Sequence, residues 1–167
     1  MECWKSVIFP LIPNFQTSIL FLLIPFLFTA CDPNRVFDEN KELADNIWDK
    51  NNKVKFEVNI ADSITPQNFY INIRHAEGYP YSNIYVFLHT TFPDGEKYTD
   101  TLNCPLADEK GQWLGDGAGD IFDRQILFKR GVRLRKLGTY TFELEQGMRD
   151  EKLPLVMDVG IRIEKAK

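Results

Sequence analysis

Three glycines and three aspartates stand together in the stretch "WLGDGAGDIFD" at residues 113–123. Oxygen ligands on a mobile loop suit calcium, so Asp116, Asp120 and Asp123 could hold one calcium ion together with backbone carbonyl oxygens. The same residues also suit a bend between two strands, because glycine adopts positive φ and aspartate side chains bond to nearby backbone amides. We predict the glycine-rich bend without a bound metal, and the lone calcium site is the alternative.

The sequence contains few residues that could form a zinc site or a nucleophilic catalytic site. His75 and His89 lie on strand-like runs and belong to no spaced pair of ligands, so a zinc site is not predicted. No serine stands in a GxSxG elbow, and Cys104 is expected to be a buried thiol. We therefore predict neither a catalytic residue nor a cofactor, and the protein is not expected to be an enzyme. A hydrolase that uses loop carboxylates is a third hypothesis.

Six basic residues and no acidic residue fall within residues 124–136. One interpretation is the solvated face of two neighbouring strands, where lysine and arginine guard a sheet edge. The other is a basic patch that meets an anionic partner, either lipid headgroups or an acidic protein. The candidate interaction residues in this segment are Arg130, Arg133 and Arg135.

Two further sets of loop residues are candidates for contact with a partner. Arg149 and Asp150 follow a strand-like run on a loop that ends at Pro154, and loops on a rigid scaffold are natural contact surfaces. Aromatic side chains near turns could instead stack on the sugars of an envelope glycan. The aromatic candidates are Tyr79, Tyr81, Tyr98 and Trp113.

The elements that must position these residues are strands. Apolar and polar residues alternate with a period of two from residue 54 onward, as in "VKFEVNI", "NFYINIRH" and "GTYTFELEQG". Turn signals separate the runs, and Asp94-Gly95 is a strong hairpin signal. The pattern predicts an all-β domain at residues 53–167, a single antiparallel β-sandwich of about seven or eight strands.

The N-terminus predicts export and lipid attachment. Lys5 precedes an uncharged, largely apolar run that ends in "LFTAC", which is typical of a lipoprotein signal peptide over residues 1–30. Its last residues resemble a bacterial lipobox, which implies a lipid on Cys31 that anchors the chain in a membrane. Residues 31–52 are polar and rich in Asp and Asn, and we expect them to form a tether.

The net charge is −4, and cleavage before Cys31 would remove one acid and one base and leave that value unchanged. A mildly acidic chain is not expected to bind nucleic acid. Cys104 would be the single cysteine left beside Cys31, so no disulfide framework is predicted.

Several stretches together resemble the gliding-motility lipoproteins of the GldH family, and the likeness covers nearly the whole chain after Cys31. The resemblance implies a lipoprotein of the cell envelope that faces the periplasm, is associated with gliding and protein secretion, and has no enzymatic activity. We expect a structural or interaction protein that contacts the membrane through Cys31 and docks onto other envelope proteins. A module that binds glycan or peptidoglycan is the alternative. The stretches are "YPYSNIYVFL", "FPDG", "TDTLNCPLAD", "GQWLGDGAGDIFD", "GTYTFELEQGMRD" and "LPLVMDVGIRIEK".

Overall fold

The computed structural model describes residues 32–166. The predicted signal peptide at 1–30 and the predicted lipid site at Cys31 lie outside this range. No helix within it is long and apolar enough to cross a membrane.

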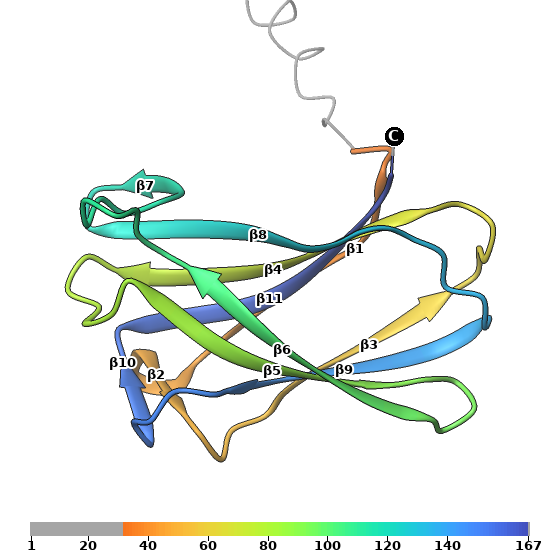
Figure 1. The fold of residues 1–167 in the computed structure, drawn as a ribbon, viewed down its shortest axis with the longest axis horizontal. Helices are drawn as coiled ribbons and strands as arrows, with labels where there is room; N and C mark the ends of the chain where they lie inside the picture. The colour runs from red at the N-terminus through yellow and green to blue at the C-terminus, as the bar shows by residue number, and fades with distance from the viewer. Residues whose placement is uncertain (1–31, 167) are drawn as a thin grey trace, which may run out of the picture. The chain divides into compact units, whose positions relative to one another are not determined.

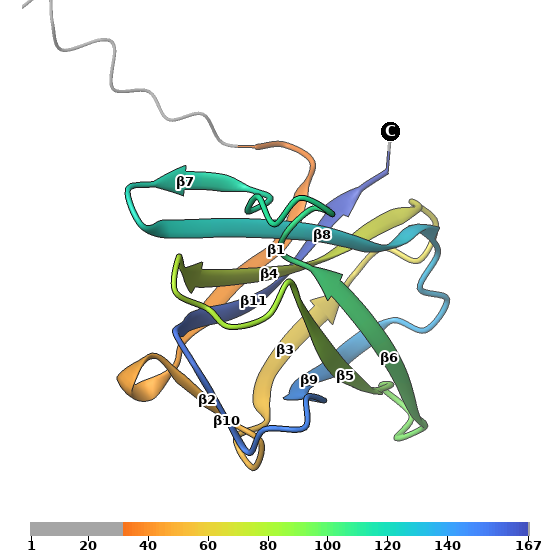
Figure 2. The ribbon, with the colours of Figure 1, turned by 60° about the vertical axis from the view of Figure 1, so that its left-hand side comes forward.

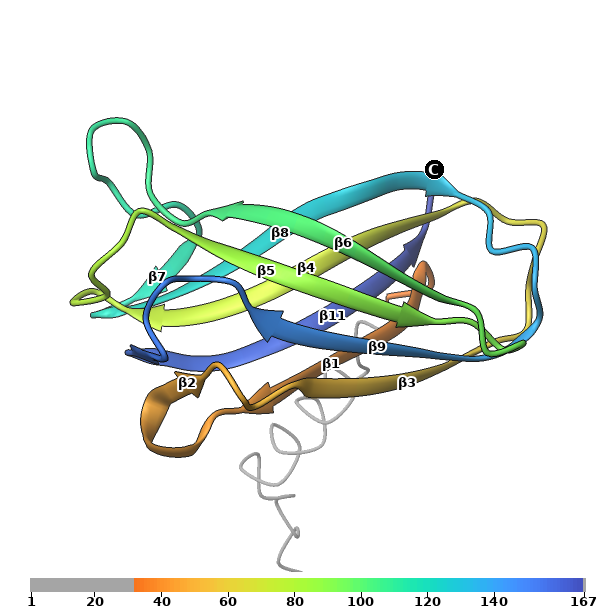
Figure 3. The ribbon, with the colours of Figure 1, turned by 60° about the horizontal axis from the view of Figure 1, so that its bottom comes forward.

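Two antiparallel sheets pack face to face as a sandwich (Figure 1). The five-stranded sheet has the order β1–β11–β4–β8–β7, and the four-stranded sheet, in front in Figure 3, has the order β3–β9–β5–β6. A ribbon of β2 and β10 completes the domain. The bounds are β1 Arg35–Glu42, β2 Ile47–Asp49, β3 Val54–Ile60, β4 Gln67–Ala76, β5 Asn83–Thr91, β6 Lys97–Pro105, β7 Asp116–Ala118, β8 Ile121–Val132, β9 Gly138–Gln146, β10 Lys152–Pro154 and β11 Val156–Lys165.

This architecture confirms the predicted all-β sandwich. The strands are more numerous than the seven or eight expected because β2, β7 and β10 are only three residues long each. The hairpin predicted at Asp94-Gly95 is present between β5 and β6, where the Gly95 amide donates to the Phe92 carbonyl at 2.9 Å.

The core lies between the two sheets and follows the alternation in the sequence. Every second residue of β3 and β4 is buried, and so are the inward residues of β9 and β11. Phe56, Ile71 and Leu144 are at most 1% exposed. Burial of such side chains is the main source of stability, at about 1.5–3 kcal/mol for each large one.

The expectation of a polar tether over residues 31–52 needs correction. β1 pairs with β11 along the edge of the five-stranded sheet, and β2 pairs with β10. The Trp48 side chain is completely buried, and the Phe37 ring packs edge-on against Phe56 with 6.5 Å between centroids. The ordered domain therefore begins near Arg35 and not at residue 53. Apart from the exposed Val36, the remaining β1 side chains are polar because this edge strand faces solvent, which removes the alternation that marks the other strands.

One titratable side chain is buried without a full set of partners. His75 on β4 has no exposed surface, and its Nδ1 lies 3.1 Å from the Ala76 carbonyl oxygen, while Nε2 has no hydrogen-bond partner. The rings of Trp113, Phe122 and Tyr79 surround it at centroid distances of 4.6, 5.7 and 5.8 Å. Burial lowers the pKa of His75 below its ordinary value, despite the opposing effects of the Ala76 carbonyl and the Asp123 charge.

Because the folded protein holds His75 neutral, lowering the pH should destabilise it. In the unfolded chain the His75 imidazole binds a proton below its ordinary pKa of 6.5. In the folded chain burial disfavours the protonated imidazole. The free energy of unfolding should therefore fall as the pH drops through and below about 6.5, toward the lowered pKa of the folded state, by at most about 1.4 kcal/mol per pH unit. Urea unfolding at several pH values measures this slope. The matched variant His75→Phe should flatten it, and an unchanged slope in that variant would contradict the assignment.

Candidate functional site

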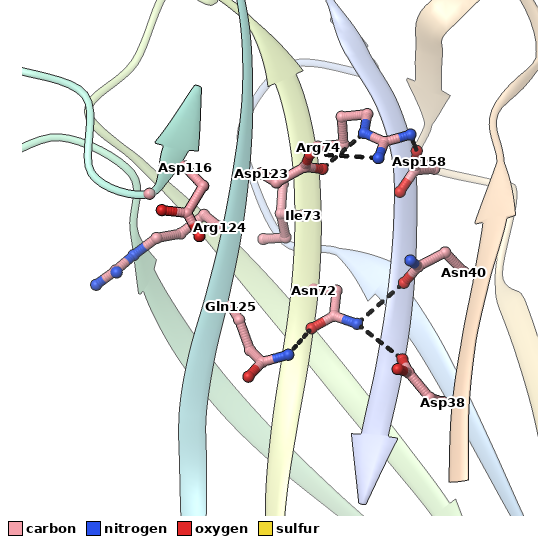
Figure 4. Close-up of a pocket in the computed structure, with 11 residues that line it drawn as sticks. Asp38, Asn40, Asn72, Ile73, Arg74, Asp116, Asp123, Arg124, Gln125 and Asp158 are labelled. Carbon is pink, nitrogen blue, oxygen red and sulfur yellow. Dashed lines mark hydrogen bonds and ion pairs between the residues drawn. The ribbon is translucent and has the colours of Figure 1, made fainter. Parts of the chain in front are cut away.

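A polar groove runs across the outer face of the five-stranded sheet and has a volume of about 630 Å³ (Figure 4). Its side chains come from β1, β4, β8 and β11, with the β7 segment at one side. The lining residues are Asp38, Asn40, Asn72, Ile73, Arg74, Gly115, Asp116, Asp123, Arg124, Gln125 and Asp158.

A row of amides crosses the floor of this groove. Asn40, Gly160, Asn72 and Gln125 are register partners on four adjacent strands. The Gln125 side-chain amide donates to the side-chain Oδ1 of Asn72 at 3.1 Å. The Asn72 side-chain amide in turn donates to the side-chain Oδ1 of Asn40 at 3.1 Å. The Asn72 amide also lies 3.5 Å from an Asp38 carboxylate oxygen. The row therefore presents ordered hydrogen-bonding groups along one line of the surface.

Gly160 makes this row possible. Asn40 and Asn72 stand on strands that are separated by β11, so their side chains can meet only above a residue without a side chain. A Cβ atom at Gly160 would lie within 1.8 Å of the Asn40 Oδ1 atom and within 2.5 Å of the Glu39 carbonyl oxygen. The absence of that atom lets the Asn40 side chain lie across β11 toward Asn72.

A charged row lies beside the amide row. Asp158, Arg74 and Asp123 are neighbours across β11, β4 and β8. The Arg74 guanidinium donates to Asp123 at 2.6 Å and pairs with Asp158 at 3.1 Å. Burial raises the pKa of Asp158, even though the Arg74 charge acts in the opposite direction, while hydrogen bonding to Asp123 raises the pKa of Arg74. Arg74 thus occupies the space between two carboxylates that could otherwise meet a cation or a water molecule.

The glycine- and aspartate-rich stretch forms the hairpin between β7 and β8 (Figure 2). Gly115 has a φ of 118°, and a Cβ atom there would lie 2.3 Å from the Asp123 carbonyl oxygen. The stretch therefore has the bend that the sequence predicted. Asp116 and Asp123 are cross-strand partners, while Asp120 lies in the turn, where its carbonyl oxygen accepts from the Glu77 amide. Within residues 32–166, no group of three acidic, histidine or cysteine residues is arranged to hold a metal ion.

The two sets of predicted interaction residues lie at opposite ends of the sandwich. Arg130 is on the last part of β8, and Arg133 and Arg135 are on the loop that leads to β9. Arg149 and Asp150 follow the other end of β9, where the Asp150 carboxylate accepts from the Tyr81 hydroxyl at 2.5 Å. The structure therefore does not bring the two sets together in one surface.

The aromatic candidates for sugar stacking do not form a platform. Tyr79 is 3% exposed, and Trp113 is half-buried against His75. Tyr81 is held by Asp150, and Tyr98 lies on β6, away from the groove. None of these four rings lines the groove.

The predicted burial of the lone thiol is confirmed. Cys104 has no exposed surface, and burial raises its pKa to about 12. A thiol in this setting stays protonated and does not act as a nucleophile.

Sequence reasoning missed the groove residues Asn40, Asn72, Gln125 and Asp158. For Asn72 the signal is its place between the buried Ile71 and Ile73, which marks it as outward-facing; the other three carry no such alternation. Only the order of the strands shows that they share one surface.

The comparisons with known proteins agree on one family. The family model described as "GldH lipoprotein" matches residues 35–163. A "Gliding motility lipoprotein GldH homolog" of Christiangramia forsetii is 34% identical over 154 residues, covering 88% of this chain and 94% of the relative. The "Gliding motility lipoprotein GldH" of Flavobacterium johnsoniae is 31% identical over 156 residues, covering 89% of this chain and 96% of the relative.

One solved structure, of the infectious bursal disease virus Gx strain, aligns with a TM-score of 0.31 and 10% identity. The alignment covers 80% of this chain and 30% of the viral chain, and a similarity this low supports no conclusion about fold or function.

A methyl group at Gly160 should destabilise the protein by loosening the edge of the sheet. Gly160→Ala forces Asn40 and the Glu39 carbonyl away from β11, at a cost of about 1–3 kcal/mol, as for other overpacked sites. Chemical unfolding measures the change. In an Asn40→Ala background the cost should shrink without vanishing, because the backbone contact remains. Equal costs in both backgrounds would show that Asn40 does not lie over the glycine.

Removal of the Arg74 charge should destabilise the protein in a pH-dependent way. Arg74→Met leaves the Asp158 carboxylate buried without its cation, at a cost of about 1–3 kcal/mol near neutral pH. The lost attraction raises the folded-state pKa of Asp158 further, so the penalty should shrink as the pH falls and the carboxyl group is protonated. Arg124→Met at the groove rim is the matched control, with a change within about 0.5 kcal/mol. A penalty for Arg74→Met that does not vary with pH would contradict this account.

Proposed function

The chain belongs to the GldH lipoprotein family, and from this premise we propose that it is a membrane-anchored component of the cell envelope that works by contact with other proteins. In this proposal a lipid on Cys31 anchors the chain, and the β-sandwich serves a gliding-motility or secretion-associated apparatus without catalysing a reaction. The two relatives carry the words "gliding motility lipoprotein" in their names, which supports this assignment.

The observation that carries the proposal is the polar groove. It presents amide and charged groups in fixed positions on a rigid sheet, which suits a partner that makes many directional hydrogen bonds. Its central carboxylates, Asp123 and Asp158, are held by Arg74, an arrangement suited to structure and recognition and not to proton transfer. The hypothesis of a hydrolase that uses loop carboxylates therefore finds no support in this groove.

The structure offers a glycan-binding module polar groups in the groove but no aromatic rings there. The groove has the polar side chains that would bond to sugar hydroxyls, but aromatic rings are missing from its lining. Sugar binding usually also needs an apolar face on which the pyranose ring can lie. A protein partner fits the groove better.

A bulky residue in the groove should remove the partner without unfolding the domain. Gln125→Trp places a large side chain at an exposed strand position, where tryptophan is well tolerated. Cross-linking in intact cells followed by mass spectrometry should recover defined envelope proteins from the wild type and lose some of them from this variant. Thr141→Trp, on the outer face of β9, is the matched control and should keep the partners.

An identical set of partners for Gln125→Trp and the wild type would contradict docking in the groove. Isolated peptidoglycan that binds the wild type but not Gln125→Trp would favour the glycan alternative. Separately, Cys31→Ala should abolish labelling by palmitate and release the protein from membranes. Labelling that persists in Cys31→Ala would contradict the lipid anchor.

A further inference from the structure

Three loops lie together at one end of the sandwich (Figures 1 and 3), and one of them is bonded to the other two. They are residues 61–66 between β3 and β4, residues 92–96 between β5 and β6, and residues 133–137 between β8 and β9. The Arg133 guanidinium donates to the Ile64 carbonyl oxygen at 3.1 Å, and the Lys136 ammonium pairs with Asp94 at 2.5 Å and with Glu96 at 2.8 Å. We call this surface the three-loop end.

The most exposed apolar side chains of the described domain lie at the three-loop end. Ile64 is 80% exposed, Leu137 is 58% exposed, and Tyr98, at the start of β6, is 56% exposed. These are the largest exposures among the large apolar and aromatic residues within 32–166. Scattered exposed apolar residues are ordinary, but three at one end, on loop tips and beside a turn, resemble the anchors of a protein at a membrane interface.

The arginines of the basic segment lie at this same end of the domain. Lys129 pairs with Asp100, and Lys136 pairs with both Asp94 and Glu96. In contrast, no ion pair forms at Arg130, Arg133 or Arg135 within the described part of the chain. All three are exposed, and guanidinium groups bind phosphate oxygens in a bidentate manner. Asp62 lies on the same surface and moderates the net charge there, but it forms no ion pair with the three arginines.

The chain enters the domain at this same end. The Asn34 carbonyl oxygen accepts from the Lys165 amide, and the Ala166 amide donates to the Pro66 carbonyl oxygen, each at 2.8 Å. Lys165 pairs across the sheet with Gln67, and Gln67 pairs with Val132. Residues 31 to 34 span at most about 10 Å, so a lipid on Cys31 would hold the three-loop end close to the bilayer surface.

An apolar cavity of about 280 Å³ also opens at this end between the two sheets. Phe69, Phe128 and Phe142 line its interior, while Tyr98 and the residue 133–136 loop lie at its rim. A packed core leaves no gap of this size, and small apolar cavities readily take apolar ligands. The cavity gives this end an apolar interior suited to hydrocarbon, with Arg133 and Arg135 among its lining residues.

From the apolar tips, the unpaired arginines, the point of chain entry and the cavity, we propose that the three-loop end lies against an anionic bilayer. Ile64, Leu137 and Tyr98 enter the headgroup region, and Arg130, Arg133 and Arg135 bind lipid phosphates. This proposal rests on the proposed lipid on Cys31. It leaves the polar groove free, because the groove covers the outer face of the five-stranded sheet and not its loop end.

A single fluorescent label can test this orientation. With Cys31 lipidated and Cys104 buried with a pKa of about 12, an introduced cysteine is the one reactive thiol of the mature lipoprotein. An environment-sensitive dye on Leu137→Cys or Ile64→Cys should show blue-shifted emission in vesicles that contain phosphatidylglycerol, compared with vesicles of phosphatidylcholine alone. The same dye on Lys110→Cys, in the exposed loop at the opposite end, should not shift.

The triple variant Arg130→Glu, Arg133→Glu and Arg135→Glu should lose the shift at Leu137→Cys while the protein still floats with the vesicles. Flotation reports the lipid anchor and emission reports the contact, so failure of the anchor is distinguished from failure of this proposal. Unshifted emission at both loop positions in protein that floats would overturn the proposal. So would an equal shift at Lys110→Cys, or a shift that survives the triple variant. Circular dichroism confirms that each variant remains folded.

Discussion

β11 lies between β1 and β4 and pairs with both, so its alternating side chains determine what each face of the five-stranded sheet carries. Val159 and Ile161 point into the core, while Asp158 lines the polar groove and Gly160 lies against Asn40. A slip of one residue in either pairing would exchange these faces and bury a carboxylate in place of an isoleucine. The core and the groove therefore depend on one register, and the glycine at its centre lets the amides of neighbouring strands meet above it.

This arrangement separates two kinds of surface on one rigid body. The groove offers fixed hydrogen-bonding groups on the outer face of the sheet, whereas the three-loop end offers exposed arginines and exposed apolar tips. A protein held at a membrane needs both kinds, one toward the lipid and one toward its partners. The chain belongs to the GldH lipoprotein family, and both surfaces belong to the part of the chain that the family model matches or directly adjoins.

The sequence predicted the parts of the fold in which one face of a strand is buried. Alternation along β3, β4 and β9 predicted the burial of residues such as Phe56, Ile71 and Phe142. β1 was missed because it is an edge strand whose side chains are mostly polar, and its place depends on backbone bonds to β11. The groove could not be predicted, since Asn40, Asn72 and Gln125 become neighbours only through the order of four strands that lie far apart in the chain. Likewise, the basic segment was visible in the sequence, but its position at the end where the chain enters was not.

Amide hydrogen exchange of the mature lipoprotein in anionic nanodiscs, compared with detergent, tests the central claim most directly. If the sandwich stands with its loop end on the bilayer and its groove free for partners, exchange should slow at residues 61–66 and 133–137. Exchange at the exposed edge strand β1 beside the groove should stay the same. Protection of β1 with unchanged exchange in the loops would place the groove against the lipid and contradict the account.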